Sequence, residues 1–290
     1  MTTPTQPDIQ AFFDEATSTI TYLVSDSQSK KAAIIDPVLD YDPKAGRTST
    51  ASAEAVLAAA RKGGLDVIWI LETHAHADHL SAAQFLRAKT GAKIAIGANI
   101  TKVQTMFREI FHATDVTPDG SVFDQRFKEG EHFAIGNLDV EVIYTPGHTP
   151  GCVSYKIGNN VFVGDTMFMP DYGTARADFP GGDARVLYRS IRKLLALPPE
   201  TNLWMCHDYQ TPERDTHAWQ TSVGEQRAKN IHVHDGVSED EFVAMREARD
   251  KTLDMPVLIL PSIQVNIRAG HMPPAEDDGH TYLKIPLNRI

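Results

Sequence analysis

The segment THAHADH, residues 73–79, places three histidines and one aspartate close together: His74, His76, Asp78 and His79. Imidazole and carboxylate groups are ligands that both zinc and iron accept in proteins. The cluster therefore predicts a metal centre with catalytic chemistry. Its residue types leave two chemistries open, hydrolysis at a pair of zinc ions and oxygen activation at a single iron ion.

Three further candidate ligands lie far along the chain, and each directly follows an apolar segment. His148 ends the segment VIYTPGH, Asp165 ends VFVGD and His207 ends LWMCH. The histidine cluster likewise follows the apolar segment at 65–72. Rigid strands can direct loops at one edge of a sheet, so ligands distant in sequence can converge on one ion. The seven side chains together predict one centre at the ends of several strands.

The other histidines lack this context. No metal-binding role is expected for His112, His132, His217, His271 and His280. The segment HVH, residues 232–234, repeats the spacing of His74 and His76, but no strand precedes it and no Asp and His follow. We therefore expect no metal there. The two cysteines, Cys152 and Cys206, are expected to be small buried residues on strands and not a disulfide framework.

The composition is that of an ordinary globular protein. The 290 residues include 42% hydrophobic and 23% charged residues, with a net charge of −10. The acidic balance and the lack of a basic cluster argue against binding to nucleic acid or anionic lipid. No apolar run is long enough for a membrane-spanning helix, and the N-terminus does not have the pattern of a signal peptide. A cytoplasmic location without membrane attachment is therefore expected.

Short strands alternate with helices along the part of the chain that carries the ligands. Strands are predicted at 19–26, 31–38, 65–72, 93–97, 138–145, 152–158, 160–165 and 202–207, and helices at 51–62, 80–91, 183–197, 217–230 and 238–250. A segment with several prolines follows, from 255 to 290. No repeat or low-complexity linker divides the chain. We therefore predict one domain over residues 1–290, in which 210–290 form a C-terminal elaboration that packs on the same domain and contributes to the substrate pocket.

Four motifs occur in the order that is typical of the metallo-β-lactamase superfamily: HAHADH, PGHTPG, GDT and a late HD. The chain resembles this superfamily over at least residues 17–209. The resemblance implies an α/β fold (α+β in some schemes), namely an αββα sandwich with the metal site at one edge between its two sheets. The C-terminal elaboration would add helical and extended structure to this sandwich.

Within the superfamily the chain resembles the glyoxalase II branch, and more closely its ETHE1-like persulfide dioxygenases. The segments that carry the likeness are THAHADHLSAA (73–83), PGHTPGCVSY (146–155), DYGTARADFPGGDARVLYRSI (171–191) and CHDY (206–209) with VNIRAG (265–270). Hydrolases of the branch usually have Glu where Asp208 stands. The segment DFPGGDAR is similar to the bacterial dioxygenases, and no rhodanese domain of the kind that some relatives carry is expected in these 290 residues.

The resemblance implies a dioxygenase that oxidises glutathione persulfide with O₂ to sulfite and glutathione. One Fe(II) per chain would be bound by His74, His148 and Asp165. The residues expected to orient ligands and to move protons are His76, Asp78, His79 and His207. A homodimer is also expected from the resemblance alone.

A glyoxalase II-like thioesterase would use the same residues differently, with two zinc ions as its cofactor. His74, His76 and His148 would bind one ion, Asp78, His79 and His207 the other, and Asp165 would bridge them. Because all seven residues are present, the ligands alone do not separate the two functions. The flanking segments favour the dioxygenase.

Five residues are expected to contact the glutathione part of the substrate: Arg176, Tyr172, Tyr209, Asn266 and Arg268. An arginine can bind a carboxylate through two parallel hydrogen bonds, and glutathione offers two carboxylates.

Overall fold

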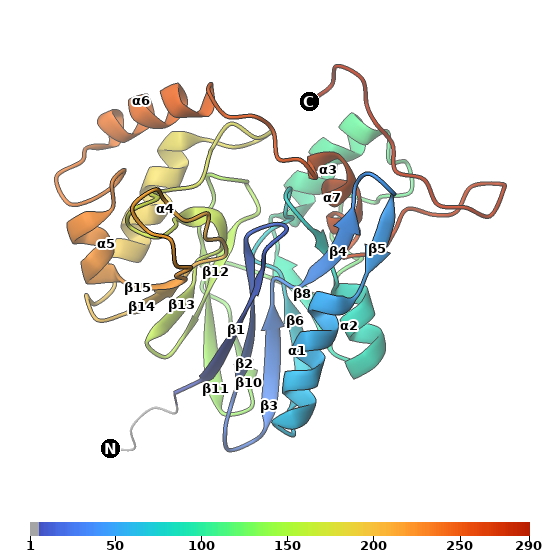
Figure 1. Cartoon of the computed structure of the whole chain (residues 1–290), viewed down its shortest axis with the longest axis horizontal. Helices are drawn as coiled ribbons and strands as arrows, with labels where there is room; N and C mark the ends of the chain where they lie inside the picture. Colours follow the sequence, from blue (N-terminus) through green and yellow to red (C-terminus); the bar gives the residue numbers. More distant parts are fainter. Residues whose placement is uncertain (1–5) are drawn as a thin grey trace.

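The computed structural model describes residues 6–290 and consists of two facing β-sheets with helices on both outer faces (Figure 1). This arrangement confirms the αββα sandwich of the metallo-β-lactamase fold. The first sheet contains β1 (Asp8–Asp14), β2 (Thr19–Ser25), β3 (Lys31–Ile35), β6 (Asp66–Leu71), β8 (Lys93–Gly97) and β9 (Gln125–Phe127), in that spatial order. Strands β1, β2 and β3 are antiparallel, and β3, β6, β8 and β9 are parallel.

The second sheet also has six strands, and a small third sheet lies beside the sandwich. The second sheet contains β10 (His132–Ile135), β11 (Leu138–Tyr144), β12 (Val153–Ile157), β13 (Asn160–Phe162), β14 (Asn202–Trp204) and β15 (Gln220–Ser222), in that order. The small sheet contains β5 (Arg47–Ser49), β4 (Val38–Asp42) and β7 (Leu80–Ser81). All neighbours in the second sheet are antiparallel except β13 and β14.

Helices cover both outer faces of the sandwich. The first sheet is covered by α1 (Ala51–Lys62), α2 (Ala83–Thr90), α3 (Ile100–Phe111) and α7 (Ile259–Asn266), and the second by α4 (Ala184–Leu195), α5 (Val223–Lys229) and α6 (Glu239–Asp250). Asp183 caps α4 by accepting from the Val186 backbone N–H, and Ser238 and Glu241 form a capping box at the start of α6. No helix in residues 6–290 has the length and apolar character needed to cross a bilayer.

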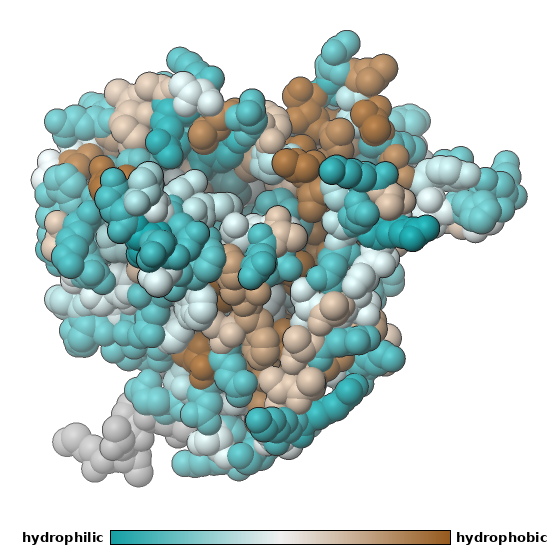
Figure 2. Space-filling view, viewed as in Figure 1, coloured by the Kyte–Doolittle hydropathy of each residue, from teal (hydrophilic) through white to brown (hydrophobic). Residues whose placement is uncertain are grey.

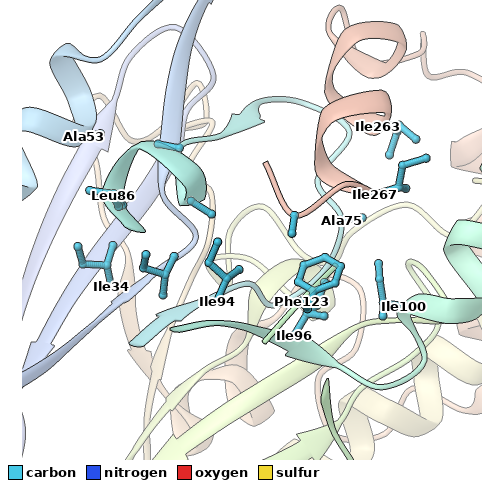
Figure 3. Close-up of a cluster of buried hydrophobic side chains, with 14 of the residues drawn as sticks. Ile34, Ala53, Ala75, Leu86, Ile94, Ile96, Ile100, Phe123, Ile263 and Ile267 are labelled. Carbon is cyan, nitrogen blue, oxygen red and sulfur yellow. The ribbon is translucent and has the colours of Figure 1, made fainter. Parts of the chain in front are cut away.

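The alternation of side chains along each strand separates the cores. In β2, Ile20, Tyr22 and Val24 face the core between the sheets, whereas Leu23 faces the helices on the other side. Figure 3 shows the outer core, in which Ile94 from β8 lies near Leu86 from α2. Ile263 from α7 belongs to this same core, so the C-terminal segment packs on the first sheet as well as on the second.

Most of the predicted elements are present. The strands at 19–26 and 31–38 form an antiparallel hairpin, and the helix at 51–62 has the predicted bounds. The helix predicted at 80–91 begins only at Ala83, because Leu80 and Ser81 pair with β4, and it ends at Gly91 with a positive φ. The first part of 217–230 is strand β15 and only its second part is helical.

Two helices are not among the predicted elements. Helix α3 buries Ile100, Val103 and Phe107 on one face, which is a regular helical spacing. Helix α7 lies in the proline-containing C-terminal segment, with Pro261 in its first turn. Proline is tolerated there because the first backbone nitrogens of a helix have no partner within the helix. The assignment of 210–290 as an elaboration of a single domain stays a prediction.

Candidate metal centre

The seven candidate ligands lie on four segments that each follow a strand. The segment with His74, His76, Asp78 and His79 follows β6, His148 follows β11, Asp165 lies in the 3₁₀ turn after β13 (Gly164–Thr166), and His207 follows β14. Six of these side chains are buried and Asp78 is half-buried. The structure therefore brings all seven residues into one buried cluster, where the prediction expected them.

His74, His148 and Asp165 form one group of possible ligands, with donor atoms within 4.8 Å of one another. Asp165 Oδ2 lies 3.6 Å from His148 Nε2 and 4.0 Å from His74 Nε2. Two imidazoles and one carboxylate at this spacing suit a single ion that keeps further coordination positions free.

The second oxygen of the Asp165 carboxylate faces a different group. Asp165 Oδ1 lies 3.3 Å from His207 Nε2, and this nitrogen lies 3.4 Å from Asp78 Oδ2. His79 and His76 complete this side, since their donor atoms lie within 4.8 Å of a carboxylate oxygen of Asp78. The carboxylate of Asp165 thus stands between two sets of donors, so the geometry admits one metal ion or two.

Hydrogen bonds on the outer side of each ring fix which nitrogen faces the centre. His148 Nδ1 donates to the Arg176 carbonyl oxygen at 2.8 Å, and His79 Nδ1 donates to the Leu80 carbonyl oxygen at 3.0 Å. Thr73 Oγ1 donates to Asp36, so it accepts from His74 Nδ1 at 3.0 Å. In each ring the Nε2 lone pair is therefore left for a metal ion.

His76 has the opposite orientation. Its Nε2 lies 2.9 Å from Asp36 Oδ1 and 3.6 Å from Glu72 Oε2, so its Nδ1 faces the cluster. Burial alone would lower the pKa of His76, but the charge and hydrogen bond of Asp36 raise it to about 10. A bound cation would displace the proton from Nδ1, because the second proton can stay on Nε2 beside Asp36.

The buried atoms without partners test whether a cation fits here. In residues 6–290, eight buried side-chain polar atoms have no hydrogen-bond partner, and five of them belong to the candidate ligands. These five are His74 Nε2, His76 Nδ1, His79 Nε2, His207 Nε2 and Asp165 Oδ1. Each buried polar atom left unpaired costs about 1–3 kcal/mol. Five such atoms in one cluster fit the binding of one metal ion or two, for which they would serve as ligands or as hydrogen-bonding neighbours.

A cavity of about 940 Å³ opens above this cluster and is the candidate substrate site. Asp78, His148 and Asp165 lie in its wall, as do Tyr172 and Tyr209. The two tyrosine rings are 5.1 Å apart, and the Tyr209 ring is stacked 5.5 Å from His207. Both tyrosines thus line the cavity beside the metal cluster, and their predicted contact with the glutathione part of the substrate stays a prediction.

Arg176 also lines the cavity, but its donors are engaged. Its Nε and Nη2 donate to the two oxygens of Asp178 at 2.6 and 2.8 Å, and its Nη1 donates to the Asp254 carbonyl oxygen at 2.6 Å. The guanidinium also lies 4.9 Å from the centre of the Phe179 ring. Arg176 thus joins the cavity wall to the segment after α6.

Asn266 and Arg268 are not among the residues that line the cavity, so their expected contact with substrate stays a prediction. Asn266 Nδ2 donates to the carbonyl oxygens of His76 and His79 at 2.8 Å each, and its Oδ1 accepts from the Ser81 N–H. Arg268 donates to both oxygens of Asp115 at 2.7 Å. Both side chains point into the protein because helix α7 turns this face towards α3 and the metal-binding loop.

Asp36 holds Thr73 and the candidate ligand His76 in place, and the sequence analysis did not predict this role. It is 2% exposed, and besides His76 it accepts from the Thr73 N–H at 2.7 Å and from Thr73 Oγ1 at 2.8 Å. Its signal was available, since Asp36 directly follows β3 as the ligands follow their strands. The histidines that were expected to lack a metal role belong to none of the possible ligand groups in the described chain.

The model of the metallo-beta-lactamase superfamily matches residues 16–207. A probable metallo-hydrolase of Burkholderia pseudomallei is 54% identical over 97% of this chain and 99% of its own length. Glyoxylase B2 of Dictyostelium discoideum is 51% identical over 97% of both chains. The human mitochondrial persulfide dioxygenase ETHE1 is 28% identical over 92% of this chain and 90% of its own.

Relatives also include longer proteins and a solved structure. The chain spans 65% of a beta-lactamase hydrolase-like protein of Xylella fastidiosa, to which it is 51% identical. The crystal structure of ETHE1 from Myxococcus xanthus matches with a TM-score of 0.74 and 30% identity, over 91% of this chain and 100% of that one. Since the superfamily model ends at residue 207, this match extends into the C-terminal segment.

Proposed function

Because the chain belongs to the metallo-beta-lactamase superfamily, we propose that it is a persulfide dioxygenase of the ETHE1 type. It would oxidise glutathione persulfide with O₂ and release sulfite and glutathione. The observation that carries this proposal is the likeness to ETHE1 of Myxococcus xanthus over the whole of that chain.

The proposed cofactor is one Fe(II), held by His74, His148 and Asp165, which form one group at the base of the cavity. An ion held by these three residues would provide the redox chemistry that joins the persulfide sulfur with O₂. The protein contributes rigid ligands. The outer hydrogen bonds of His74 and His148 keep each Nε2 directed at the centre.

The remaining four residues of the cluster would orient the reactants and hold protons. His207 Nδ1 lies 3.3 Å from the Ser18 carbonyl oxygen and donates to it, which leaves Nε2 between the carboxylates of Asp78 and Asp165. A proton placed on Nε2 can therefore be shared with either carboxylate. His76 and His79 are held at the same side of the cluster, 4.2 Å apart between ring centres.

An aromatic wall would limit the access of water to the reacting sulfur. The Phe168 ring packs edge to face against Tyr172 and Tyr209, with centres 5.7 Å apart in both pairs. These rings extend from His207 to the cavity mouth. Exclusion of bulk water is useful here because a persulfide anion and its oxidised forms are reactive towards water and thiols.

A glyoxalase II-like zinc thioesterase is the second candidate, and one observation favours it. The two oxygens of Asp165 face separate donor groups, which is the arrangement that a bridging ligand of two ions requires. The 51% identity to Glyoxylase B2 of Dictyostelium discoideum agrees with this candidate.

One experiment separates the two functions. The protein is purified without oxygen, its iron and zinc are quantified, and it is supplied with glutathione persulfide or with S-lactoylglutathione. One iron per chain with oxygen uptake and sulfite release supports the dioxygenase. Two zinc ions with thioester hydrolysis and no oxygen uptake would replace it by the second candidate.

A further inference from the structure

One arginine outside the metal cluster connects two segments of the cavity wall. Arg214 lies in the loop between β14 and β15, and its Nε donates to Asp171 Oδ2 at 2.7 Å. Its Nη1 and Nη2 donate to the two oxygens of Asp208 at 2.8 and 2.6 Å. Nη2 also lies 3.2 Å from Asp171 Oδ1, and Nη1 donates to the Thr216 carbonyl oxygen at 2.8 Å. All five N–H groups of the guanidinium are therefore engaged.

The two aspartates that this guanidinium joins each precede a tyrosine of the cavity. Asp171 is followed by Tyr172, and Asp208 is followed by Tyr209. Both tyrosines line the cavity, with their ring centres 5.1 Å apart. The Tyr209 ring is also stacked on His207, at 5.5 Å between centres and 16° between planes. The guanidinium thus fixes the backbone one residue before each of these two rings.

The loop that carries the arginine has little support from apolar burial. Among residues 209–217, all of which the structure describes, none is buried. Figure 2 shows mainly hydrophilic surface above β14 and β15, where this loop runs in Figure 1. Gln210, directly after Tyr209, has a φ of 56°, a region that few residues other than glycine adopt. Hydrogen bonds, chiefly those of Arg214, must therefore hold this turn in place.

The two carboxylates differ in how well they are shielded from solvent. The Asp208 side chain is 0% exposed, and it also accepts from the Ala218 N–H at 2.9 Å. A buried carboxylate is stable only when it is paired, so Asp208 depends on Arg214. The Asp171 side chain is 38% exposed, and water can replace part of its pairing. Arg214 should therefore act more strongly on Tyr209 than on Tyr172.

We propose that Arg214 is a positioning residue that holds the Tyr209 ring against His207 and beside Tyr172, and so sets the aromatic wall next to the metal cluster. The inference rests on the proposed function only in taking this cavity as the place of reaction. The same wall would border the metal cluster in a dioxygenase and in a thioesterase. The inference also explains why the two Asp-Tyr pairs, which are far apart in sequence, lie side by side.

The first test observes the tyrosine rings directly, by fluorine NMR of zinc-loaded protein that contains 3-fluorotyrosine. The Tyr172→Phe and Tyr209→Phe variants assign the two signals. Arg214→Gln should shift the Tyr209 signal towards its position in the unfolded chain and shift the Tyr172 signal less. The signals of the remaining tyrosines should stay. An unmoved Tyr209 signal would overturn the inference, as would an equal shift of all tyrosine signals, since that would show a general loosening of the fold.

Three further variants serve as controls for this spectrum. Arg185 also donates to two carboxylates, those of Glu239 and Asp240, but on the surface, so Arg185→Gln should leave every tyrosine signal in place. Arg214→Lys keeps the charge but not the planar fork, and should give a smaller shift of the Tyr209 signal than Arg214→Gln.

Asp171→Asn weakens only the more exposed pair, so it should move the Tyr172 signal more than the Tyr209 signal. If Arg214→Gln does not fold, Asp171→Asn and Arg214→Lys decide the inference by these same shifts. The reverse order of the two shifts in Asp171→Asn would overturn it.

The second test asks whether the effect of Arg214 passes through Tyr209. Arg214→Gln should lower kcat/KM about tenfold at unchanged metal content, which lies within the coupling range of residues in one network. In a Tyr209→Ala background the same change should cost little, because the positioned ring is already absent. Full additivity of the two substitutions would overturn the inference.

The inference and the proposed function fail in different ways. Oxygen uptake with glutathione persulfide measures kcat/KM if the protein is a dioxygenase, and hydrolysis of S-lactoylglutathione measures it if the protein is a thioesterase. No oxygen uptake by the wild type, together with a shifted Tyr209 signal in Arg214→Gln, would refute the dioxygenase and support the inference. Normal oxygen uptake by the wild type with an unmoved Tyr209 signal in the variant would refute only the inference.

Discussion

The metal-binding loop at 73–81 and the mouth of the cavity differ in how their side chains are held. The loop is buried, and Asp36 and Asn266 bind its side chains and its backbone through several hydrogen bonds each. At the mouth, Arg47 and Arg249 are exposed and have no protein acceptor in the described chain. The loop is therefore held in place by the protein itself, whereas nothing in the described chain fixes the guanidinium groups of the mouth.

The largest effect is expected at Asp165, which connects both halves of the metal cluster. Asp165→Ala removes the carboxylate oxygens that face His148 on one side and His207 on the other. We expect loss of stoichiometric metal and of activity, measured by elemental analysis and by oxygen uptake. Asp139→Ala, at an exposed acidic residue of β11, is the control and should keep both. Full metal content and full oxygen uptake in Asp165→Ala would refute the assignment.

The sequence predicted the loop far better than the mouth, and the reason is physical. A ligand that directly follows a strand is placed by the strand, so the positions of His148, Asp165 and His207 can be read from local pattern. Arg249 is one of several charged residues on an exposed helix face, and only the packing of α6 beside the cavity distinguishes it. Local pattern contains no information about that packing.

The orientation of Asn266 and Arg268 also could not be predicted from local sequence pattern. Their segment was singled out by its likeness to the family, but the direction of its side chains depends on helix α7, which the prolines of this region did not predict. The amide of Asn266 then faces the backbone of the loop and not the substrate. A sequence motif can thus identify a segment near the site whose residues do not contact the substrate. Such residues act by positioning the metal ligands.

The second largest effect is expected at Asn266. Its substitution tests whether hydrogen bonds from helix α7 hold the metal-binding loop in place. Asn266→Ala leaves the carbonyl oxygens of His76 and His79 and the N–H of Ser81 without this partner. The free energy of unfolding should fall by about 3 kcal/mol, and metal should dissociate faster. Denaturant unfolding and chelator-induced metal loss measure the two effects. Asn288→Ala, at an exposed residue, is the control.

If Asn266→Ala lowers the free energy of unfolding but leaves the rate of metal loss unchanged, the positioning role of Asn266 is refuted. In that case α7 would support only the core that it shares with α3. A change in the KM for glutathione persulfide at unchanged metal content would instead return Asn266 to the substrate site, contrary to its position outside the cavity.

A pH-dependent effect is expected at His232, which lies beneath the wall of the cavity. Burial, followed by the charges of Arg246 and Arg249, lowers the pKa of His232 to about 4. Its Nδ1 accepts from the Thr174 N–H at 3.1 Å, which requires the neutral ring. A depressed folded-state pKa gives stability that is complete above pH 6.5 and is lost as the pH falls from 6.5 through 4. The loss is at most about 3 kcal/mol.

Unfolding of the metal-free protein at several pH values measures this effect. His232→Asn keeps an acceptor near Thr174 but does not titrate, so the difference in unfolding free energy between the variant and the wild type should change between pH 6.5 and 4. The histidines of the metal cluster titrate in both proteins and cancel in the difference. A pH-independent difference would show that His232 is not held neutral by its surroundings.

The smallest effect is expected at Arg268 and separates structural from substrate-binding arginines. Arg268→Ala removes a bidentate ion pair with Asp115, whose side chain is 35% exposed, so the free energy of unfolding should fall by only about 1 kcal/mol. Because Arg268 lies outside the cavity, binding of glutathione should not change. Denaturant unfolding and calorimetry on the variant and the wild type measure the two quantities. Weaker glutathione binding in Arg268→Ala at an unchanged free energy of unfolding would show that Arg268 contacts the substrate, and would refute its structural role.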